Sequence, residues 1–87
     1  MAVFVYILKA SRTGKRYVGI TVDLDRRISQ HNANWSRATR GQGPWKLLYS
    51  ETCEDYVSAR KRERFFKSGP GHAFLKVYLE GVRVRRV

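Results

Sequence analysis

The sequence has 87 residues, of which 43% are hydrophobic and 13% aromatic, and its 18 Lys and Arg outnumber its 7 Asp and Glu for a formal net charge of +11. This length suffices for one domain, since domains rarely fall below ~50 residues. The aromatic content argues against disorder. The charge indicates an anionic polymer as partner, most often a nucleic acid.

The sequence also disfavours a membrane-spanning protein and a protein with a signal peptide. No apolar run approaches the ~18–20 residues that a membrane-spanning helix needs, and the first ten residues (MAVFVYILKA) have no basic leader ahead of their apolar stretch. The single cysteine, Cys53, excludes an internal disulfide and a multi-cysteine zinc site. We therefore expect a cytoplasmic protein that does not cross a membrane.

The expected elements follow from the apolar periodicity and the turn residues. In chain order they are strand 3–8, hairpin loop 10–15, strand 16–20, helix 23–32, basic loop 33–44, strand 45–51, helix 55–67 and helix 72–80. The first two strands should pair antiparallel. Thr21 and Asp23 are candidate N-caps of the first helix, and Gly69 and Pro70 should end the second.

The order ββαβαα indicates a compact α+β domain built on a small sheet. We expect this domain to occupy residues 1–80. The last residues, 81–87, alternate basic and apolar side chains and form either an edge strand or a frayed basic tail.

One carboxylate stands out on the second helix. Tyr56, Ala59 and Phe66 fall on one stripe of that helix, and Glu63 lies in the middle of it. An unpaired buried carboxylate costs several kcal/mol, so Glu63 needs a cation or a strong hydrogen-bond partner. The pattern favours an ion pair with a neighbouring arginine. The functional alternative is a ligand for Mg²⁺, which often takes one or two protein carboxylates and keeps several waters.

Four other polar residues are candidates to converge with Glu63. Tyr6 and Tyr17 point away from the aliphatic sides of their strands, and Arg27 and His31 lie one helical turn apart. Phosphodiester hydrolysis needs a group that deprotonates water, a cation for the developing charge and a metal. These residues have the chemistry for it, although each is also compatible with a structural role.

The same residues carry a family signature. Phe4-Val5-Tyr6 and Tyr17-Val18-Gly19 resemble the two halves of the GIY-YIG nuclease motif, with FVY in place of GIY. DLDRRISQHN at 23–32 resembles the helix that follows, in which an Arg precedes a His or Tyr by four residues, and this selects Arg27 with His31. SARKRERFFKSG resembles the helix with the metal-binding Glu, which corresponds to Glu63. The resemblance runs from residue 3 to about 75.

The resemblance implies a three-stranded antiparallel sheet flanked by helices. It also implies an endonuclease that uses Mg²⁺ or Mn²⁺ to cut one DNA strand, with single-stranded, branched or damaged DNA as substrate. Some branches use a late Asn beyond the Glu helix, and this chain has no Asn after Asn34.

The resemblance also implies a role for each residue. Tyr6 activates the attacking water, with its proton drawn towards His31, and cationic neighbours should lower the pKa of Tyr6 for this purpose. Arg27 contacts the scissile phosphate and Glu63 holds the metal. Tyr17 orients the phosphate or the water, and Gly19 lets the DNA backbone approach closely.

DNA binding should depend on phosphate contacts and weaken steeply with salt. The candidate residues are Arg12, Lys15, Arg16, Arg37, Arg40, Arg60, Arg62, Arg64 and Lys67. Trp35 and Trp45 are candidates to stack on bases, although a Trp at a strand start, such as Trp45, is more often a core residue. His72 and Cys53 are interpreted as structural. The competing hypotheses are a nucleic-acid-binding module that kept the fold without turnover, and an RNA-binding accessory protein.

Overall fold

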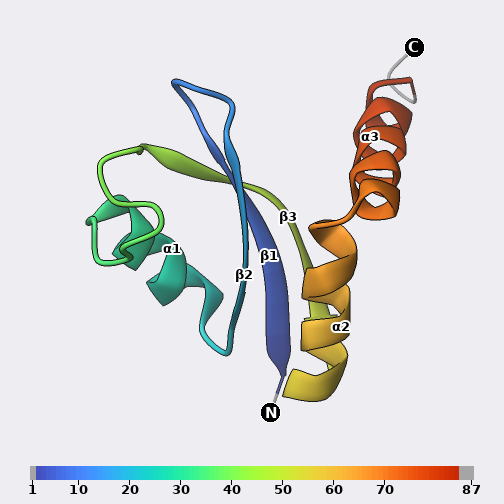
Figure 1. The fold of residues 1–87 in the computed structure, drawn as a ribbon, viewed down its shortest axis with the longest axis horizontal. Helices are drawn as coiled ribbons and strands as arrows, with labels where there is room; N and C mark the ends of the chain where they lie inside the picture. Colours follow the sequence, from blue (N-terminus) through green and yellow to red (C-terminus); the bar gives the residue numbers. More distant parts are fainter. Residues whose placement is uncertain (1, 85–87) are drawn as a thin grey trace.

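A three-stranded antiparallel sheet in the order β2-β1-β3 forms the centre of the computed structural model (Figure 1), which describes the backbone of residues 2–84 and the side chains as far as residue 79. The elements are β1 (Val3–Ala10), β2 (Arg16–Thr21), α1 (Leu24–Asn32), β3 (Trp45–Cys53), α2 (Tyr56–Phe66) and α3 (Gly69–Val84). The predicted α+β class and the ββαβαα order are confirmed.

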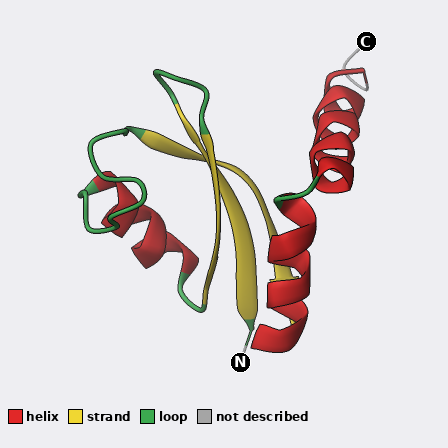
Figure 2. Cartoon of the chain, viewed as in Figure 1, coloured by secondary structure: helices red, strands yellow, loops and turns green. Residues whose placement is uncertain are grey.

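The two faces of β1 pack against different helices, because successive side chains of a strand point to opposite sides. Val3, Val5 and Ile7 pack with Ala59 and Phe66 of α2 on one face. On the other face, Tyr6, Leu8 and Ala10 pack with Trp45 and with Leu24 and Ile28 of α1. Figure 2 accordingly shows α1 on one side of the sheet and α2 on the other.

Local signals in the sequence set most of the boundaries. Asp23 caps α1, its side chain accepting a hydrogen bond from the backbone N–H of Arg26, and Asp55 caps α2 in the same way through Ser58. The hairpin between β1 and β2 contains Gly14 at a φ of 77°, a left-handed conformation that glycine adopts without strain. The Asp23 cap and the hairpin turn are features that the sequence predicted, whereas the cap at Asp55 is not.

Helix α3 differs from the prediction. Gly69 and Pro70 begin α3 instead of only ending α2, because proline is tolerated in a first helical turn, where its missing N–H has no partner to lose. Gly71 permits the tight junction, since a Cβ there would collide with the carbonyl oxygen of Phe65. The helix continues to Val84, so the start of the 81–87 segment is helical and not an edge strand; residues 85–87 lie outside the described chain. The division into 1–80 and 81–87 stays a prediction.

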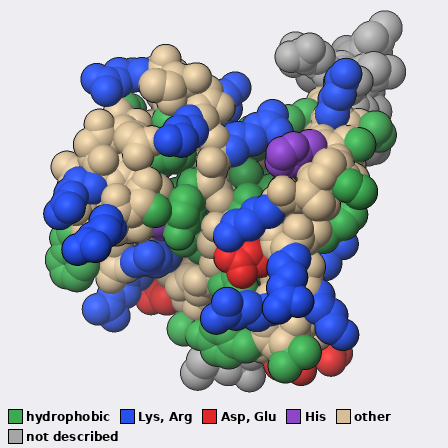
Figure 3. Space-filling view, in the orientation of Figure 1, with side chains coloured by type: hydrophobic (Ala, Val, Ile, Leu, Met, Phe, Trp, Pro, Cys, Tyr) green, Lys and Arg blue, Asp and Glu red, His purple; other side chains and the backbone are tan. Residues whose placement is uncertain are grey.

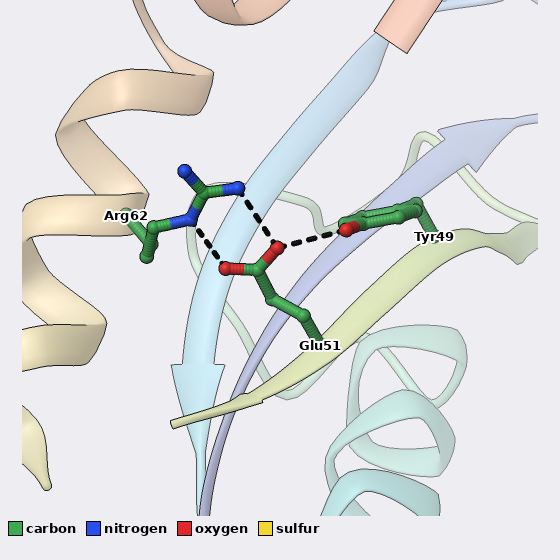
Figure 4. A network of polar contacts seen from close by, with 3 residues as sticks. All are labelled: Tyr49, Glu51 and Arg62. Carbon is green, nitrogen blue, oxygen red and sulfur yellow. Dashed lines mark hydrogen bonds and ion pairs between the residues drawn. The ribbon is translucent and has the colours of Figure 1, made fainter. Parts of the chain in front are cut away.

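A closed polar cluster fastens α2 to β3 (Figure 4). Arg62 donates from Nε and Nη2 to the two carboxylate oxygens of Glu51, and the Tyr49 hydroxyl donates to the same carboxylate at 2.8 Å. The Arg62 guanidinium also lies 4.7 Å from the Phe65 ring centre and 4.8 Å from that of Phe66.

Within the described chain, no helix is both long and apolar enough to span a membrane.

Candidate active site

A shallow pocket of about 230 Å³ lies across β2, the edge strand of the sheet. It is bordered by α1 on one side and by α2 on the other. Its lining residues are Tyr6, Tyr17, Gly19, Ile20, Arg27, Tyr56, Arg60 and Glu63. On the face shown in Figure 3, acidic side chains near the middle of the molecule have blue Lys and Arg side chains around them. The pocket therefore brings together four of the five predicted catalytic and metal-binding residues.

Tyr6 lies at the base of this pocket with only 1% of its surface exposed. Its hydroxyl is 2.8 Å from Nε2 of His31. Burial raises the pKa of the Tyr6 phenol, and the nearby Arg27 guanidinium offsets that effect only in part. The expectation that cationic neighbours lower this pKa is therefore wrong: the loss of solvent outweighs them, and Tyr6 is held as a neutral phenol.

His31 is fully buried behind Tyr6 and does not line the pocket. Its Nδ1 is 2.7 Å from the Thr39 hydroxyl. Burial, together with the positive charge of Arg27, lowers the pKa of His31 to about 4. The imidazole is therefore neutral at pH 7 and has one donor and one acceptor nitrogen.

Thr39 is the residue that the sequence interpretation missed. It lies in the 33–44 loop, is fully buried, and accepts a hydrogen bond from the Trp45 indole through its carbonyl oxygen at 3.2 Å. Trp45, only 3% exposed, is thus a core residue and not a base-stacking one. The sequence predicts a basic loop over residues 33–44, and no local signal marks one of its small polar residues as buried.

Arg27 reaches the pocket from α1 with its side chain half-buried. Its Nη1 donates to the amide oxygen of Gln30 at 2.9 Å. Two ion pairs occur among the described side chains, Arg62 with Glu51 and Lys67 with Glu63, and neither includes Arg27. The guanidinium charge is therefore uncompensated by a carboxylate and is available to a phosphate.

Glu63 reaches the same pocket from α2, with 18% of its side chain exposed. Its partner is the Lys67 ammonium at 3.1 Å, one helical turn away, and not an arginine as the pattern suggested. Tyr56, which was placed on the apolar stripe with it, is 55% exposed and lines the pocket. The stripe is apolar only at Ala59 and Phe66.

Comparisons with known proteins place this geometry in a family. The model of the GIY-YIG catalytic domain matches residues 2–70. The chain belongs to the GIY-YIG family. A UPF0213 protein of Desulfotalea psychrophila is 46% identical over 66 residues, which cover 74% of this chain and 59% of that protein. A UPF0213 protein of Clostridium perfringens is 42% identical over 65 residues, covering 74% of this chain and 69% of the relative.

A solved structure supports the fold. The solution NMR structure of a UPF0213 protein from Bacillus halodurans matches with a TM-score of 0.54 and 32% sequence identity, covering 93% of this chain and 87% of the other. The chain spans less than two thirds of the Desulfotalea relative's length. The family match ends at residue 70, so most of α3 lies beyond it.

The second half of the GIY-YIG motif has a packing role that the sequence did not reveal. Gly19 pairs with Tyr6 across the strands, and a Cβ there would collide with the hydroxyl and ring of Tyr6. Gly19 therefore makes room for Tyr6; because Gly19 also lines the pocket, a close approach of the DNA backbone there stays a prediction. Tyr17 lies beside it, with ring centres 6.3 Å from Tyr6 and 4.9 Å from His31.

A single carboxylate in this GIY-YIG pocket limits which metal it suits. No group of three or more His, Cys, Asp or Glu residues gathers among the side chains that the structure describes. A zinc site, which requires three or four such ligands, does not fit. Mg²⁺ fits, because it takes one or two carboxylates and completes its shell with water and phosphate oxygens.

The cations that were predicted to contact DNA lie in different environments. Arg60 lines the pocket, and Lys67 forms the ion pair with Glu63. Arg62 pairs with Glu51 and packs over aromatic rings, so a contact with DNA would compete with that ion pair. The others lie exposed around the hairpin, in the 33–44 loop and on α2: Arg12, Lys15, Arg16, Arg37, Arg40 and Arg64.

Proposed function

We propose that this GIY-YIG protein is a metal-dependent endonuclease that hydrolyses phosphodiester bonds in DNA. The observation that carries the proposal is the meeting of Tyr6, Arg27 and Glu63 at one pocket, although they come from three separate elements. A phenol, a guanidinium and a carboxylate supply a water-activating group, a phosphate-binding cation and a metal ligand. A packing role alone gives no reason for an unpaired arginine to face the other two.

In this proposal, Tyr6 orients the attacking water and takes its proton. The raised pKa of Tyr6 means that the phenol is neutral at the start. We assign the Tyr6 hydroxyl as the donor to Nε2 of neutral His31, which places the imidazole proton on Nδ1, facing the Thr39 hydroxyl. As the water loses a proton to the Tyr6 oxygen, the hydroxyl proton can shift along this bond to Nε2. Because the lowered pKa of His31 disfavours a buried imidazolium, Nε2 would hold that proton only transiently and return it to the Tyr6 oxygen when the proton from the water leaves the site.

Arg27 binds the scissile phosphate. Among the described side chains its guanidinium contacts only neutral groups, the Gln30 amide and the Tyr6 phenol, so a bound phosphate gives it a counter-charge. Because negative charge on the phosphoryl oxygens grows in the transition state, the contact strengthens during the reaction. Arg60, on the opposite wall of the pocket, can hold the same strand through a second phosphate.

Glu63 is the residue that would hold Mg²⁺ or Mn²⁺. When bound, the metal supplies Lewis-acid stabilisation of the phosphate and leaving-group oxygens. The Lys67 ammonium now neutralises the Glu63 carboxylate, and that pair keeps the carboxylate at the pocket wall before a metal arrives. Tyr17 would position the phosphate or the water through its hydroxyl.

The cations outside the pocket would hold the DNA by its phosphates. Lys15 and Arg16 flank the hairpin, while Arg37, Arg40 and Arg64 extend the basic surface to the loop and to α2. Phosphate contacts carry no sequence information by themselves. We therefore propose recognition of DNA structure, such as single-stranded, branched or damaged DNA, with affinity that falls as salt rises.

The test measures cleavage of single-stranded, flap and duplex DNA by wild type and by two carboxylate variants, with Mg²⁺, Mn²⁺ or EDTA. We expect wild type to cleave at least one substrate with a metal and none in EDTA. Glu63→Gln should remove metal-dependent cleavage and leave DNA binding within about twofold. Glu54→Gln, which changes an exposed carboxylate outside the pocket, should cleave like wild type. DNA binding without cleavage in wild type under every metal condition would contradict the proposal and favour a non-catalytic binding module.

A further inference from the structure

A second pocket of about 290 Å³ adjoins the candidate active site, between β2 and the junction of α2 with α3. Its lining residues are Ile7, Arg16, Tyr17, Val18, Phe66, Lys67, His72 and Leu75. Tyr17 lines both pockets. The Glu63–Lys67 ion pair also links them, because its carboxylate belongs to the first pocket and its ammonium to the second.

The two kinds of side chain in this second pocket suit the two parts of a nucleotide. The half-buried Val18 supplies apolar surface against which a planar base can lie, over the buried side chains of Phe66 and Leu75 at the base of the pocket. Tyr17 and the exposed His72 offer aromatic faces for stacking. Arg16 and Lys67 are exposed cations that can bind the phosphate next to that base.

The charge and position of the pocket argue for the substrate strand itself as occupant. A small apolar ligand would not use the cations, and a free anion would not use the apolar surface. A strand whose phosphate lies at Arg27 must continue along the surface, and Tyr17 makes this pocket continuous with the first. The volume is near the ~300 Å³ lower end of ligand pockets, which suits a small occupant such as one nucleotide.

We propose that this second pocket holds the nucleobase of the nucleotide adjacent to the scissile phosphate. This inference rests on the proposed function and adds a requirement on the substrate. A base inserted between β2 and the α2–α3 junction cannot remain paired or stacked in a duplex. The strand to be cut is therefore unpaired at that nucleotide, or becomes unpaired on binding.

The geometry also gives His72 a role that the sequence did not assign. His72 had been interpreted as structural, yet its side chain is exposed on the pocket lining near the start of α3. Lys76 follows it by one helical turn, is also exposed, and does not line the pocket. His72→Ala and Lys76→Ala are therefore a matched pair of exposed α3 truncations, one at the pocket and one outside it.

The experiment is a titration of the metal-free protein with two probes, followed by amide and methyl NMR. The probes are deoxyadenosine 5′-monophosphate and deoxyribose 5-phosphate, which differ only by the base. We expect the nucleotide to shift the methyl signals of Val18 and Leu75 and to bind roughly 5- to 100-fold more tightly than the sugar phosphate, the range that stacking of a base contributes. His72→Ala should lower the nucleotide affinity at least about fivefold, and Lys76→Ala should retain it.

Equal affinity for the two probes, or shifts confined to other surfaces, would overturn the proposal, because charge alone would then explain binding. The outcome is independent of turnover. Base-dependent binding at Val18 and Leu75 by a chain that cuts no DNA would support the second pocket and contradict the nuclease. Metal-dependent cleavage without base-dependent binding would contradict the second pocket and leave the nuclease intact.

Discussion

Two polar clusters of this molecule both contain an arginine and a tyrosine but differ in how their charges are paired. On the α2 side, Arg62 is paired with Glu51, which also accepts from Tyr49, so every charge has a partner inside the protein. On the α1 side, Tyr6 bonds to neutral His31, and the partners of Arg27 among the described side chains, the Gln30 amide and the Tyr6 phenol, are both neutral. The first cluster needs nothing from outside, whereas the second has a spare positive charge facing a pocket. The missing counter-charge, more than the residue types, is therefore the reason to propose the second cluster as the functional one.

The two arginines give the sharpest contrast. Arg27→Ala should reduce the single-turnover rate of DNA cleavage by roughly 100- to 1,000-fold, the effect of removing one donor to transition-state charge. The free energy of unfolding of Arg27→Ala should differ from that of wild type by less than about 1 kcal/mol, because the lost hydrogen bond to Gln30 is partly exposed. Rapid-quench cleavage and urea unfolding measure the two quantities. Cleavage at the wild-type rate would show that the spare charge is not used.

The two clusters should also separate by pH. The pKa of His31 is lowered to about 4 in the folded protein from an unfolded value near ~6.5. The unfolded chain therefore takes up a proton first as pH falls, and the folded state loses up to about 3 kcal/mol between pH 6.5 and 4. This contribution is complete above pH 6.5. Urea unfolding at pH 7.0, 5.5 and 4.5 should show the loss in wild type and a flatter profile in His31→Gln.

Glu51 titrates in a different range. Burial alone raises the pKa of Glu51, but the hydrogen bonds from Arg62 and Tyr49 outweigh it and the net pKa is lowered. Its contribution to stability is therefore present above its unfolded value of about 4.5 and is lost as pH falls further. If the free energy of unfolding of His31→Gln falls as steeply as that of wild type between pH 6.5 and 5, groups other than His31 cause the loss of stability in that range.

Arg62 should matter for stability and not for chemistry. Arg62→Met removes the cation from Glu51 and leaves that half-buried carboxylate with only Tyr49, which should cost about 2 kcal/mol. In a domain of this size, the loss corresponds to a fall in Tm of roughly 8–16 °C. Cleavage per folded molecule should stay within about twofold of wild type at a temperature where both proteins are folded. A large loss of cleavage in the folded variant would place Arg62 among the functional residues.

Thr39 tests how the open cluster is held. Thr39→Val keeps the shape but leaves Nδ1 of buried His31 without a partner, which should cost about 1 kcal/mol. Thr39→Ser keeps the hydroxyl and should recover most of that loss. Nitrogen NMR of His31 should show a proton fixed on Nδ1 in wild type and in the serine variant, with mixed tautomers in the valine variant. A proton fixed on Nε2 in wild type would contradict the direction of the Tyr6 bond.

The sequence predicted the fold well where local chemistry decides it. The N-cap at Asp23, the Gly14 hairpin and the alternation in β1 all act within a few residues, so the strands and the first two helices were located to within about two residues. The start of α3 was misjudged because Gly69 and Pro70 suit both the end of one helix and the first turn of the next.

The site was predictable in its residues and less so in their surroundings. Tyr6, Arg27 and Glu63 were found through spacing and resemblance, but the neutral state of Tyr6 depends on burial that only the packed fold provides. Thr39 was missed because its partner, His31, is eight residues away through an irregular loop. The ion pair of Arg62 was not predicted, because its partner, Glu51, lies on β3 and the sequence pattern of α2 alone does not indicate it.

The most direct test removes one hydroxyl from each cluster. Tyr6→Phe and Tyr49→Phe each delete a single hydrogen bond, and each should cost about 1 kcal/mol of stability. Single-turnover cleavage of the preferred DNA should fall roughly 100- to 10,000-fold in Tyr6→Phe, as expected when a group that accepts the water's proton is lost, and should stay within about twofold of wild type in Tyr49→Phe. Wild-type cleavage by folded Tyr6→Phe would contradict the assignment of the active site to the pocket on β2.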